Sequence, residues 1–148
     1  MTNNFEKDYA REQENLKAYE AAKAQNSEAG IEAARAAHNA LAAEIEAKGK
    51  AYCRLYREYE QAMESGNTYL DINDTVWDRD VEALIVCMKE NGIEHFTFSS
   101  TWSSAVETAW LFQKAGCKLE DLIEINSHCK AFMSDEYEKK HGYLFGLN

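Results

Sequence analysis

The spacing of apolar side chains in the first 65 residues constrains the fold of this chain more than any other feature. From Ile31 to Ala62 the spacing follows steps of three and four, the pattern of one face of an α-helix. The residues of this stripe are Ile31, Ala34, His38, Leu41, Ile45, Lys48, Tyr52, Leu55, Tyr59 and Ala62. About 33 residues in helical form extend about 50 Å. The spacing therefore predicts one long helix over 31–62.

An earlier helix is predicted over 5–23 by the same spacing. Its stripe consists of Phe5, Tyr9, Glu12, Leu16, Tyr19 and Lys23. Residues 26–30 interrupt the pattern, and Ser27 suits the N-cap of the second helix. A loop this short joins neighbouring antiparallel helices. We therefore expect an antiparallel helical hairpin over 1–65. Because its stripe includes alanine, His38 and Lys48, we expect the hairpin to rest on the remaining chain or on a second copy.

The composition changes near Ser65-Gly66. Of the 21 alanines, 16 precede this point, whereas all three tryptophans follow it. Residues 66–148 alternate strand-like runs with helical patterns. We predict strands at 68–72, 95–99 and 122–125, helices at 75–88, 102–112 and 135–141, and an apolar tail at 143–145.

The predicted fold class is therefore α/β: an N-terminal antiparallel helical hairpin followed by a small sheet with βαβαβ order and covering helices. The predicted domains are 1–65 and 66–148, with the alternative that both form one compact unit. We expect right-handed crossovers between the strands. Thr75 is the predicted cap of the first helix in this half, and Ser100 or Thr101 that of the second. Trp77, Trp102 and Val106 are placed on buried helix faces.

The charge of the chain excludes several classes of partner. There are 26 acidic and 16 basic residues, a net charge of -10, which opposes nonspecific binding to DNA or anionic lipid. No stretch of about 18 apolar residues is present, so we expect no membrane association. Met1 to Asp8 is polar and is not a secretory signal. Four cysteines without a regular framework indicate a reducing cytoplasm.

Familiar catalytic motifs are missing from the sequence. It contains no glycine-rich phosphate loop, no G-x-S-x-G nucleophile turn and no H-E-x-x-H helix. The hydroxyl-rich segment 99–104 suits either helix capping or an anion site, but residues 90–113 contain no lysine or arginine that could pair with a phosphate. Capping is therefore the interpretation we adopt. A nucleophile pair of Cys129 with His95 or His141 has no local signature. We expect that the protein is not an enzyme.

Zinc is the one cofactor that the residue types allow. The candidate ligands are Cys117, His128, Cys129 and His141, in the spacing Cys-x10-His-Cys-x11-His, since thiolate and imidazole are the ligands that zinc prefers. The alternative is that Cys87 and Cys117 are small core residues and the histidines face solvent. Cys53 and His38 are interpreted as packing residues of the long helix.

Acidic residues dominate the segment from Glu58 to Glu82, where Arg79 is the only base. They are Glu58, Glu60, Glu64, Asp71, Asp74, Asp78, Asp80 and Glu82. One interpretation is a solvated face whose aspartates stabilise the following helix. The other is an acidic face that binds a basic protein surface and imitates a row of phosphates. On the second interpretation, reversing Asp71, Asp74 and Asp78 to lysine weakens binding and leaves the fold intact.

Two stretches carry a resemblance to a known group of proteins. They are 94–107 (EHFTFSSTWSSAVE) and 116–119 (GCKL). From Gly92 onward, about a third of the chain, the sequence resembles a C-terminal module of small uncharacterised proteins of bacterial mobile elements. Some proteins of this sort are anti-CRISPR inhibitors, including inhibitors of the type II RNA-guided nuclease. The resemblance implies a protein target in a bacterial host and allows a metal, and it assigns no functional residue.

Together these observations predict an acidic, cytoplasmic inhibitor that binds a protein. The expected partner is a basic surface, such as that of a type II CRISPR nuclease, and the expected mechanism is stoichiometric hindrance of nucleic-acid loading. Direct binding to nucleic acid is not expected. Two alternatives remain: a non-enzymatic adaptor that dimerises through its helical hairpin, and a small zinc-binding protein. The sequence is compatible with a monomer or a homodimer.

Overall fold

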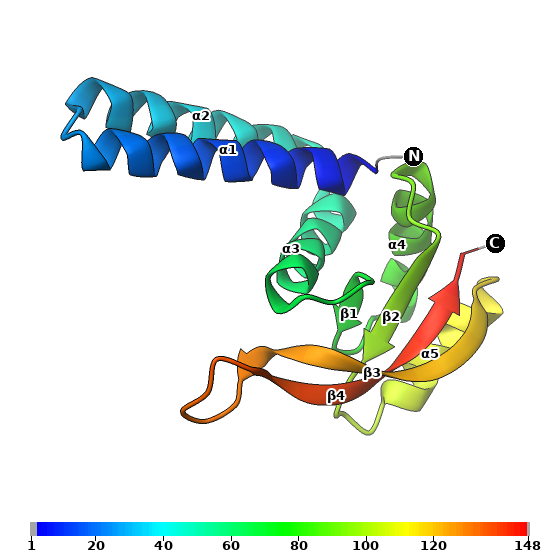
Figure 1. Ribbon diagram of the computed structural model, residues 1–148. Helices are drawn as coiled ribbons and strands as arrows, with labels where there is room; N and C mark the ends of the chain where they lie inside the picture. The colour runs from blue at the N-terminus through cyan, green and yellow to red at the C-terminus, as the bar shows by residue number, and fades with distance from the viewer. Residues whose placement is uncertain (1–2, 148) are drawn as a thin grey trace.

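The computed structural model describes residues 3–147, which form five helices and a four-stranded sheet (Figure 1). The elements in chain order are α1 (Asn4–Ala24), α2 (Glu28–Ala47), α3 (Lys50–Ser65), β1 (Asp71–Asn73), α4 (Asp78–Glu90), β2 (His95–Ser99), α5 (Ala105–Lys114), β3 (Lys118–Lys130) and β4 (Tyr137–Gly146). The predicted α/β class, with N-terminal helices followed by a small sheet, is confirmed.

The sheet has the strand order β1-β2-β4-β3. β1 is parallel to β2, whereas β4 is antiparallel to both β2 and β3. β1, β2 and β3 therefore run in one direction, and β4 is inserted between the second and the third. This arrangement keeps the predicted strand–helix–strand–helix–strand order and adds one central strand that the sequence pattern did not indicate.

β4 replaces the helix predicted over 135–141, which is wrong. Tyr137–Gly146 pairs with β2 on one side and β3 on the other, for example Phe145 with Phe96 and with Leu119. Ser134 accepts a hydrogen bond from the Glu136 N–H in the β3–β4 turn and caps no helix. The local helix preference of the Glu and Lys residues is overcome, because a central strand satisfies its backbone on both edges and buries Phe145 completely.

The helical hairpin is confirmed, but the single helix predicted over 31–62 is wrong. Ser27 caps α2 as predicted, since its hydroxyl accepts from the Gly30 N–H at 3.1 Å. The predicted long helix is divided at Gly49, whose φ of 104° and ψ of 170° belong to a region that is essentially restricted to glycine. After this break the chain turns away from the hairpin, and α3 runs toward the sheet (Figure 1).

Gly49→Ala is expected to lower the free energy of unfolding by about 1–3 kcal/mol, because a β-carbon disfavours this backbone conformation. Nothing lies within 4 Å of the position that a Cβ would take, so the cost is conformational and not steric crowding. Urea unfolding followed by circular dichroism measures it. A matched control is Ala43→Gly, a helix-interior change on exposed α2 that is expected to cost about 1 kcal/mol. An unchanged or higher stability of Gly49→Ala would contradict the break.

One hydrophobic core joins the base of the hairpin to the sheet. Phe5 of α1 and Tyr52 and Leu55 of α3 belong to the same buried cluster as Phe96 and Phe112. The Asp8 carboxylate adds polar links, since it accepts hydrogen bonds from Tyr52 and from Lys48. Beyond this base, α1 and α2 project away from the body (Figure 1).

The two faces of the sheet differ in chemistry. Successive side chains of a strand point to opposite faces. One face carries Phe96 and Phe98 of β2 beside Tyr143 and Phe145 of β4, and Phe112 of α5 packs against this face. The alternate residues of β2 are polar. They lie on the other face, where α3 contacts β1 and β3.

Several side chains that the sequence pattern placed in the core are exposed. Trp77 is 74% exposed, and Trp102 and Val106 are each 65% exposed. The predicted caps also differ, since α4 begins after Trp77 and α5 begins after Ser104, and neither helix has a side-chain cap. α5 is rotated so that Phe112 and Thr108 face the sheet, which leaves the other side of the helix uncovered.

Candidate functional site

The structure separates the eight predicted acidic residues into three groups. Glu58 and Asp71 lie in a polar pocket between α3 and the sheet. Glu60 and Glu64 lie on α3, where they share a second hollow with Glu58 and where their charges contribute to the raised pKa of Tyr9 of α1. The remaining four lie where β1 leads into α4, and we call them the acidic turn: Asp74 in the connection, and Asp78, Asp80 and Glu82 at the start of α4. The acids therefore do not form one continuous face.

Asp71 is 7% exposed and belongs to the interior, which corrects its assignment to a partner-binding face. Its Oδ1 accepts a hydrogen bond from Thr97 at 2.7 Å, and its Oδ2 accepts one from Ser99 at 2.7 Å. Lys140 of β4 reaches the same Oδ2 at 3.1 Å. A charge reversal at this position would break a buried network, so the expectation that Asp71→Lys leaves the fold intact is also wrong.

Lys140 of the central strand β4 contacts two residues of β1 in this pocket. Besides Asp71, its Nζ contacts Asn73 Oδ1 at 3.3 Å. No pattern in the sequence joins Lys140 to Asp71, since sixty-nine residues separate them and only the pairing of β4 beside β2 brings them together. The lysine charge is therefore balanced within the fold.

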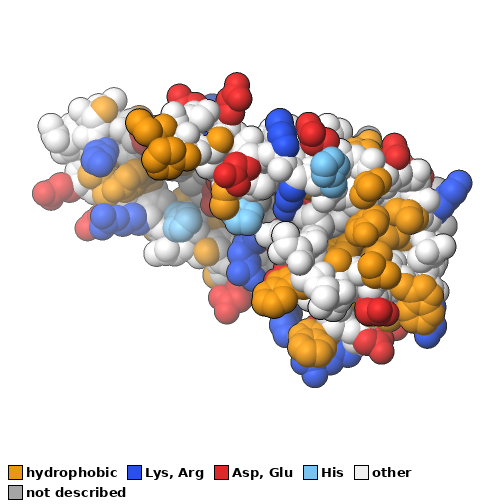
Figure 2. All heavy atoms as spheres, turned by 90° about the horizontal axis from the view of Figure 1, so that it is seen from below, with side chains coloured by type: hydrophobic (Ala, Val, Ile, Leu, Met, Phe, Trp, Pro, Cys, Tyr) orange, Lys and Arg blue, Asp and Glu red, His pale blue; other side chains and the backbone are white. Residues whose placement is uncertain are grey.

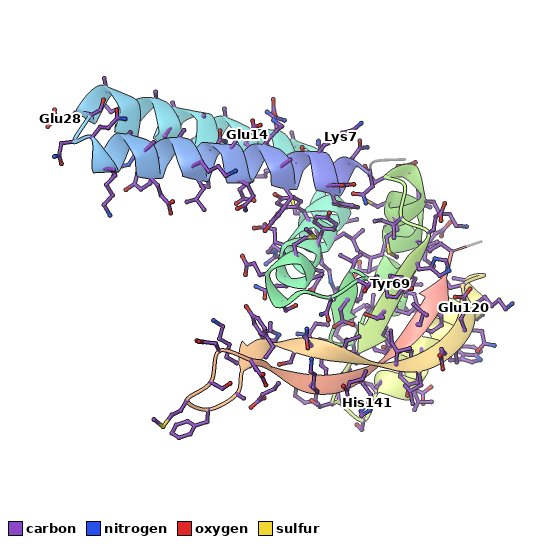
Figure 3. The ribbon with its side chains drawn as sticks, viewed as in Figure 1. Lys7, Glu14, Glu28, Tyr69, Glu120 and His141 are labelled. Carbon is purple, nitrogen blue, oxygen red and sulfur yellow. The ribbon has the colours of Figure 1, made fainter. Side chains whose placement is uncertain are left out.

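The pocket over this polar face has a volume of about 200 Å³. Its walls come from α3, β1, β3 and β4: Glu58, Gln61, Ala62, Ser65, Asn67, Asp71, Asn73, Asn126, His128 and Lys140. Asn67 closes one end by imitating a strand, because its amide pairs with both the N–H and the C=O of Asn126. In Figure 3, side chains of α3 and of the β3–β4 hairpin extend into the space between them.

Glu58 is the distinctive group of this pocket. Burial, together with the charge of Asp71, raises the pKa of its carboxyl to about 7, while Arg54, the Asn73 N–H and Lys140 act in the opposite direction. No ion pair joins Glu58 to a basic side chain within residues 3–147. A half-buried carboxyl that titrates near neutral pH in a pocket is typical of functional sites.

A second carboxyl on α3 is perturbed for a different reason. Burial and the neighbouring Glu12 of α1 raise the pKa of Glu60 to about 7. Glu12 in turn accepts a hydrogen bond from Tyr56 at 2.6 Å. Two carboxylates in contact oppose each other's ionisation. The raised pKa of Glu60 is therefore explained by its place at the junction of α1 and α3, without a binding partner. Glu64 is exposed at the end of α3.

The acidic turn meets the β2–α5 loop. Asp74 and Trp102 line the same open hollow, about 500 Å³, at the carboxyl ends of the parallel strands β1 and β2. Asp74 has a φ of 87° and donates its N–H to the Ser99 carbonyl at 2.8 Å, which connects the two turns. Crevices outside the carboxyl ends of parallel strands are frequent ligand sites in α/β proteins.

Lys140 and His141 line this same hollow beside Ser99, Ser100 and Thr101. The sequence interpretation found no base near 99–104, but β4 supplies one from the other end of the chain. Because Lys140 is paired with Asp71, it leaves little free charge for an anion. Ser100 accepts a hydrogen bond from the Trp102 N–H, so these hydroxyls stabilise the turn before α5.

An uncovered aromatic surface begins at Trp102, in the hollow that Asp74 of the acidic turn also lines. We define the aromatic surface as Trp102, Val106, Trp110, Leu119 and Leu122, which are between 43% and 65% exposed. Val106 and Trp110 lie on one side of α5, and Trp102 precedes them in the β2–α5 loop at the same four-residue spacing, a signal that the sequence contains. Figure 2 shows hydrophobic side chains gathered on this underside of the molecule. Patches of this kind on a monomer mark binding sites.

The four predicted zinc ligands are not brought together. Cys117 is buried just before β3 begins, whereas His128 and Cys129 lie near the other end of that strand. Ten residues of extended chain span about 33 Å. His141 pairs with Glu124 in the middle of the sheet, away from the end of β3 marked by Glu120 (Figure 3). Residues 3–147 contain no cluster suited to a metal, so this assignment is wrong.

The other cysteines and histidines lie apart as well. His95 pairs with Gly146 and contacts Glu120, far along the sheet from Cys129, so these two form no nucleophile pair. Cys53 is half-buried and donates to the Ile45 carbonyl at 3.5 Å, as expected for a packing residue. His38, predicted to pack, is exposed on α2.

These features define a class: a small α/β protein with a mixed sheet, a polar pocket on one face and an uncovered aromatic helix on the other. The family model of a domain of unknown function, DUF7698, matches residues 54–147, which is more than half of the chain. The protein therefore belongs to the DUF7698 family. No curated protein and no solved structure matches the chain. None of the helices within residues 3–147 has the length and apolar character needed to cross a membrane.

Proposed function

We propose that this protein acts by binding another protein, as a stoichiometric inhibitor and not as an enzyme. The observation that carries the proposal is the aromatic surface beside the acidic turn. Large apolar side chains that the monomer leaves uncovered are the residues that supply most of the energy in protein interfaces, and tryptophan is the most enriched among them. An aromatic surface edged by carboxylates fits a partner surface that is basic and partly apolar.

The acidic turn supplies the charge of this interface. Residues 74–82 contain these four carboxylates and a single base, Arg79, which lies over the Trp77 ring. Charges at the rim of an interface raise the association rate and exclude acidic partners more than they add affinity. A nucleic-acid channel is the basic surface that such a rim resembles in charge, and occupying it hinders the loading of guide or target.

The resemblance carried by residues 94–107 makes a type II RNA-guided nuclease the first partner to test. Target-DNA cleavage by the guide-loaded nuclease is measured while this protein is titrated in, and complex formation is measured directly. Inhibition that saturates near equimolar protein supports the proposal. If neither inhibition nor a complex is found, this nuclease is excluded, and a panel of purified nucleic-acid-handling proteins from bacterial hosts takes its place.

The double variant Asp78→Lys and Glu82→Lys is expected to weaken partner binding at least about tenfold, mainly through slower association at low salt. Both side chains are exposed, and the loss of Asp78 from the first turn of α4 costs only about 0.3–1 kcal/mol of stability. Surface plasmon resonance at two salt concentrations measures the rates.

The matched control for this experiment is Glu14→Lys with Glu20→Lys. These two exposed acids lie on α1, far from the aromatic surface, and the change in net charge is the same. The control protein is expected to bind as the wild type does. Equal weakening in both double variants would show that only the overall charge matters and would remove the acidic turn from the interface.

A further inference from the structure

The polar pocket between α3 and the sheet holds one carboxylate that the fold does not pair. Within this pocket, Asp71 accepts from Thr97, Ser99 and Lys140, and Asn126 donates to the Ser65 carbonyl at 2.6 Å. The carboxylate of Glu58 has no such side-chain partner among residues 3–147. The Asn73 N–H donates to this carboxylate, but a half-buried anion without an ion-pair partner remains unfavourable.

The charges around Glu58 come from every element that forms the pocket. Arg54 is on α3, Asp71 on β1, His128 on β3 and Lys140 on β4. Lys140 and Asp71 balance each other at 3.1 Å, and Lys140 also contacts Asn73. This pair is neutral as a unit, and Arg54, whose charge acts on Glu58, neither lines the pocket nor forms an ion pair with it, so Glu58 is the charge inside the pocket that lacks an ion-pair partner among residues 3–147. Anionic ligands are therefore disfavoured, and cationic ones favoured.

The remaining polar groups of the walls suit a cation that carries several N–H donors. The Gln61 side chain is exposed, whereas Asn73 is half-buried and Ser65 is buried. Asn73 Oδ1 and the Ser65 carbonyl each accept one hydrogen bond within the fold, and an amide or carbonyl oxygen can accept a second. The volume of about 200 Å³ admits a slim side chain or a small molecule but not a folded segment. A planar guanidinium group pairs with a carboxylate through two parallel hydrogen bonds, which a compact cation does not.

We propose that this pocket binds a guanidinium group, held by the carboxylate of Glu58. The group could belong to a small molecule or to an arginine side chain of a protein, and the chemistry of recognition is the same for both. The proposal concerns a site on the opposite face of the sheet from the aromatic surface, and it does not depend on the proposed function.

Proton release is the distinctive consequence. With the pKa of Glu58 raised to about 7, the carboxyl is partly protonated in the empty pocket, and a bound cation expels that proton. As the pH rises from 6 to 8, the ionised fraction of a group with this pKa grows about tenfold, and affinity for a permanent cation rises by the same factor. Above pH 8 the affinity levels off.

The test uses butylguanidinium and its uncharged analogue butylurea as probes, with the full chain. Isothermal titration calorimetry in two buffers of different ionisation enthalpy counts the protons released. Saturable binding of butylguanidinium, about one proton released at pH 6 and almost none above pH 8, and no binding of butylurea are the expected results. Absence of saturable binding, or equal binding of both probes, overturns the proposal.

Glu58→Gln is expected to weaken butylguanidinium binding at least about tenfold and to abolish proton release. Glu64→Gln is the matched control, since it makes the same change on the same helix outside the pocket and is expected to bind as the wild type does. Equal affinity of the two variants overturns the assignment to Glu58. The proton count on the wild-type protein provides a measurement that needs no variant to fold.

The two sources of the guanidinium are distinguished by a third probe, the peptide acetyl-Gly-Arg-Gly-amide. Tighter binding of the peptide than of butylguanidinium identifies an exposed arginine as the occupant, whereas tighter binding of butylguanidinium identifies a small molecule. Both results support the site. The experiment contains no partner protein, so its failure leaves the proposed inhibitor function untouched, and the failure of that function leaves this site untouched.

Discussion

Phe112→Ala is expected to lower the free energy of unfolding by about 3–5 kcal/mol, the typical cost of removing a fully buried phenylalanine. Phe112 is completely buried, and its ring centre lies 5.1 Å from that of Phe96, 5.8 Å from Phe98 and 5.6 Å from Phe145. Its ring therefore packs α5 against β2 and β4. Its removal leaves a cavity lined by three aromatic rings that cannot close without moving the sheet.

Urea unfolding followed by both fluorescence and circular dichroism measures this loss. The matched control is Trp110→Ala on the same helix, whose side chain is 55% exposed and is expected to change the stability by less than about 1 kcal/mol. Similar losses for the two variants would mean that α5 is rotated relative to the orientation described here. Since the free energy of unfolding of small domains is about 5–15 kcal/mol, Phe112→Ala is expected to remove a large fraction of it.

Asp71→Ala is expected to lower the free energy of unfolding by about 3 kcal/mol or more, because it removes the common acceptor of a buried network. The hydroxyls of Thr97 and Ser99 would each lose a partner, and Lys140, whose side chain is 25% exposed, would be left without its counter-charge. Asp71→Asn keeps the shape and one acceptor, so a smaller loss of about 1–2 kcal/mol is expected.

Asp135→Ala serves as the control for Asp71→Ala. Asp135 is exposed in the β3–β4 turn, and its loss is expected to stay within about 0.5 kcal/mol. Thermal and urea unfolding at the same pH compare the three variants. If Asp71→Ala were as stable as Asp135→Ala, the hydrogen bonds of Asp71 would not contribute to stability, and the placement of Asp71 in the interior would be contradicted.

The acidic segment from Glu58 to Glu82 is predicted from the sequence in part. The sequence predicts its acidic character, and Asp74, Asp78 and Glu82 are exposed. The sequence does not predict that the segment is discontinuous in space. Asp71 is a strand residue whose side chain points into the interior, while Asp74 follows three positions later in a turn. Burial of a carboxylate depends on the partners that meet it, here Thr97, Ser99 and Lys140, and none of these is a neighbour in the chain.

The aromatic surface was missed for a related reason. The buried face predicted for this helix consists of Trp102, Ala105, Val106, Ala109 and Phe112, since large apolar residues are most often buried. Phe112 is buried as predicted, with Ala105 and Ala109 packed against the core, whereas Trp102 and Val106 are exposed. Two apolar stripes run along this helix, one through Phe112 and one through Trp110, and hydrophobic spacing does not decide which of them faces the sheet. That choice depends on the fit of Phe112 among three phenylalanines contributed by β2 and β4.

Local chemistry was sufficient for the features that depend on residues within a turn or two of each other. The amino-acid sequence predicted the helical hairpin and its cap at Ser27, the end of α4 at Asn91-Gly92, β2 and the α/β class, because capping, turn and helix preferences act over about four residues. The tertiary structure decided that Tyr137–Gly146 is a central strand, that Asp71 is buried and Trp102 exposed, and that Lys140 closes the polar pocket. These features depend on strand pairing and burial. The free energy of both comes from contacts between residues distant in the chain, so a local sequence pattern does not predict them.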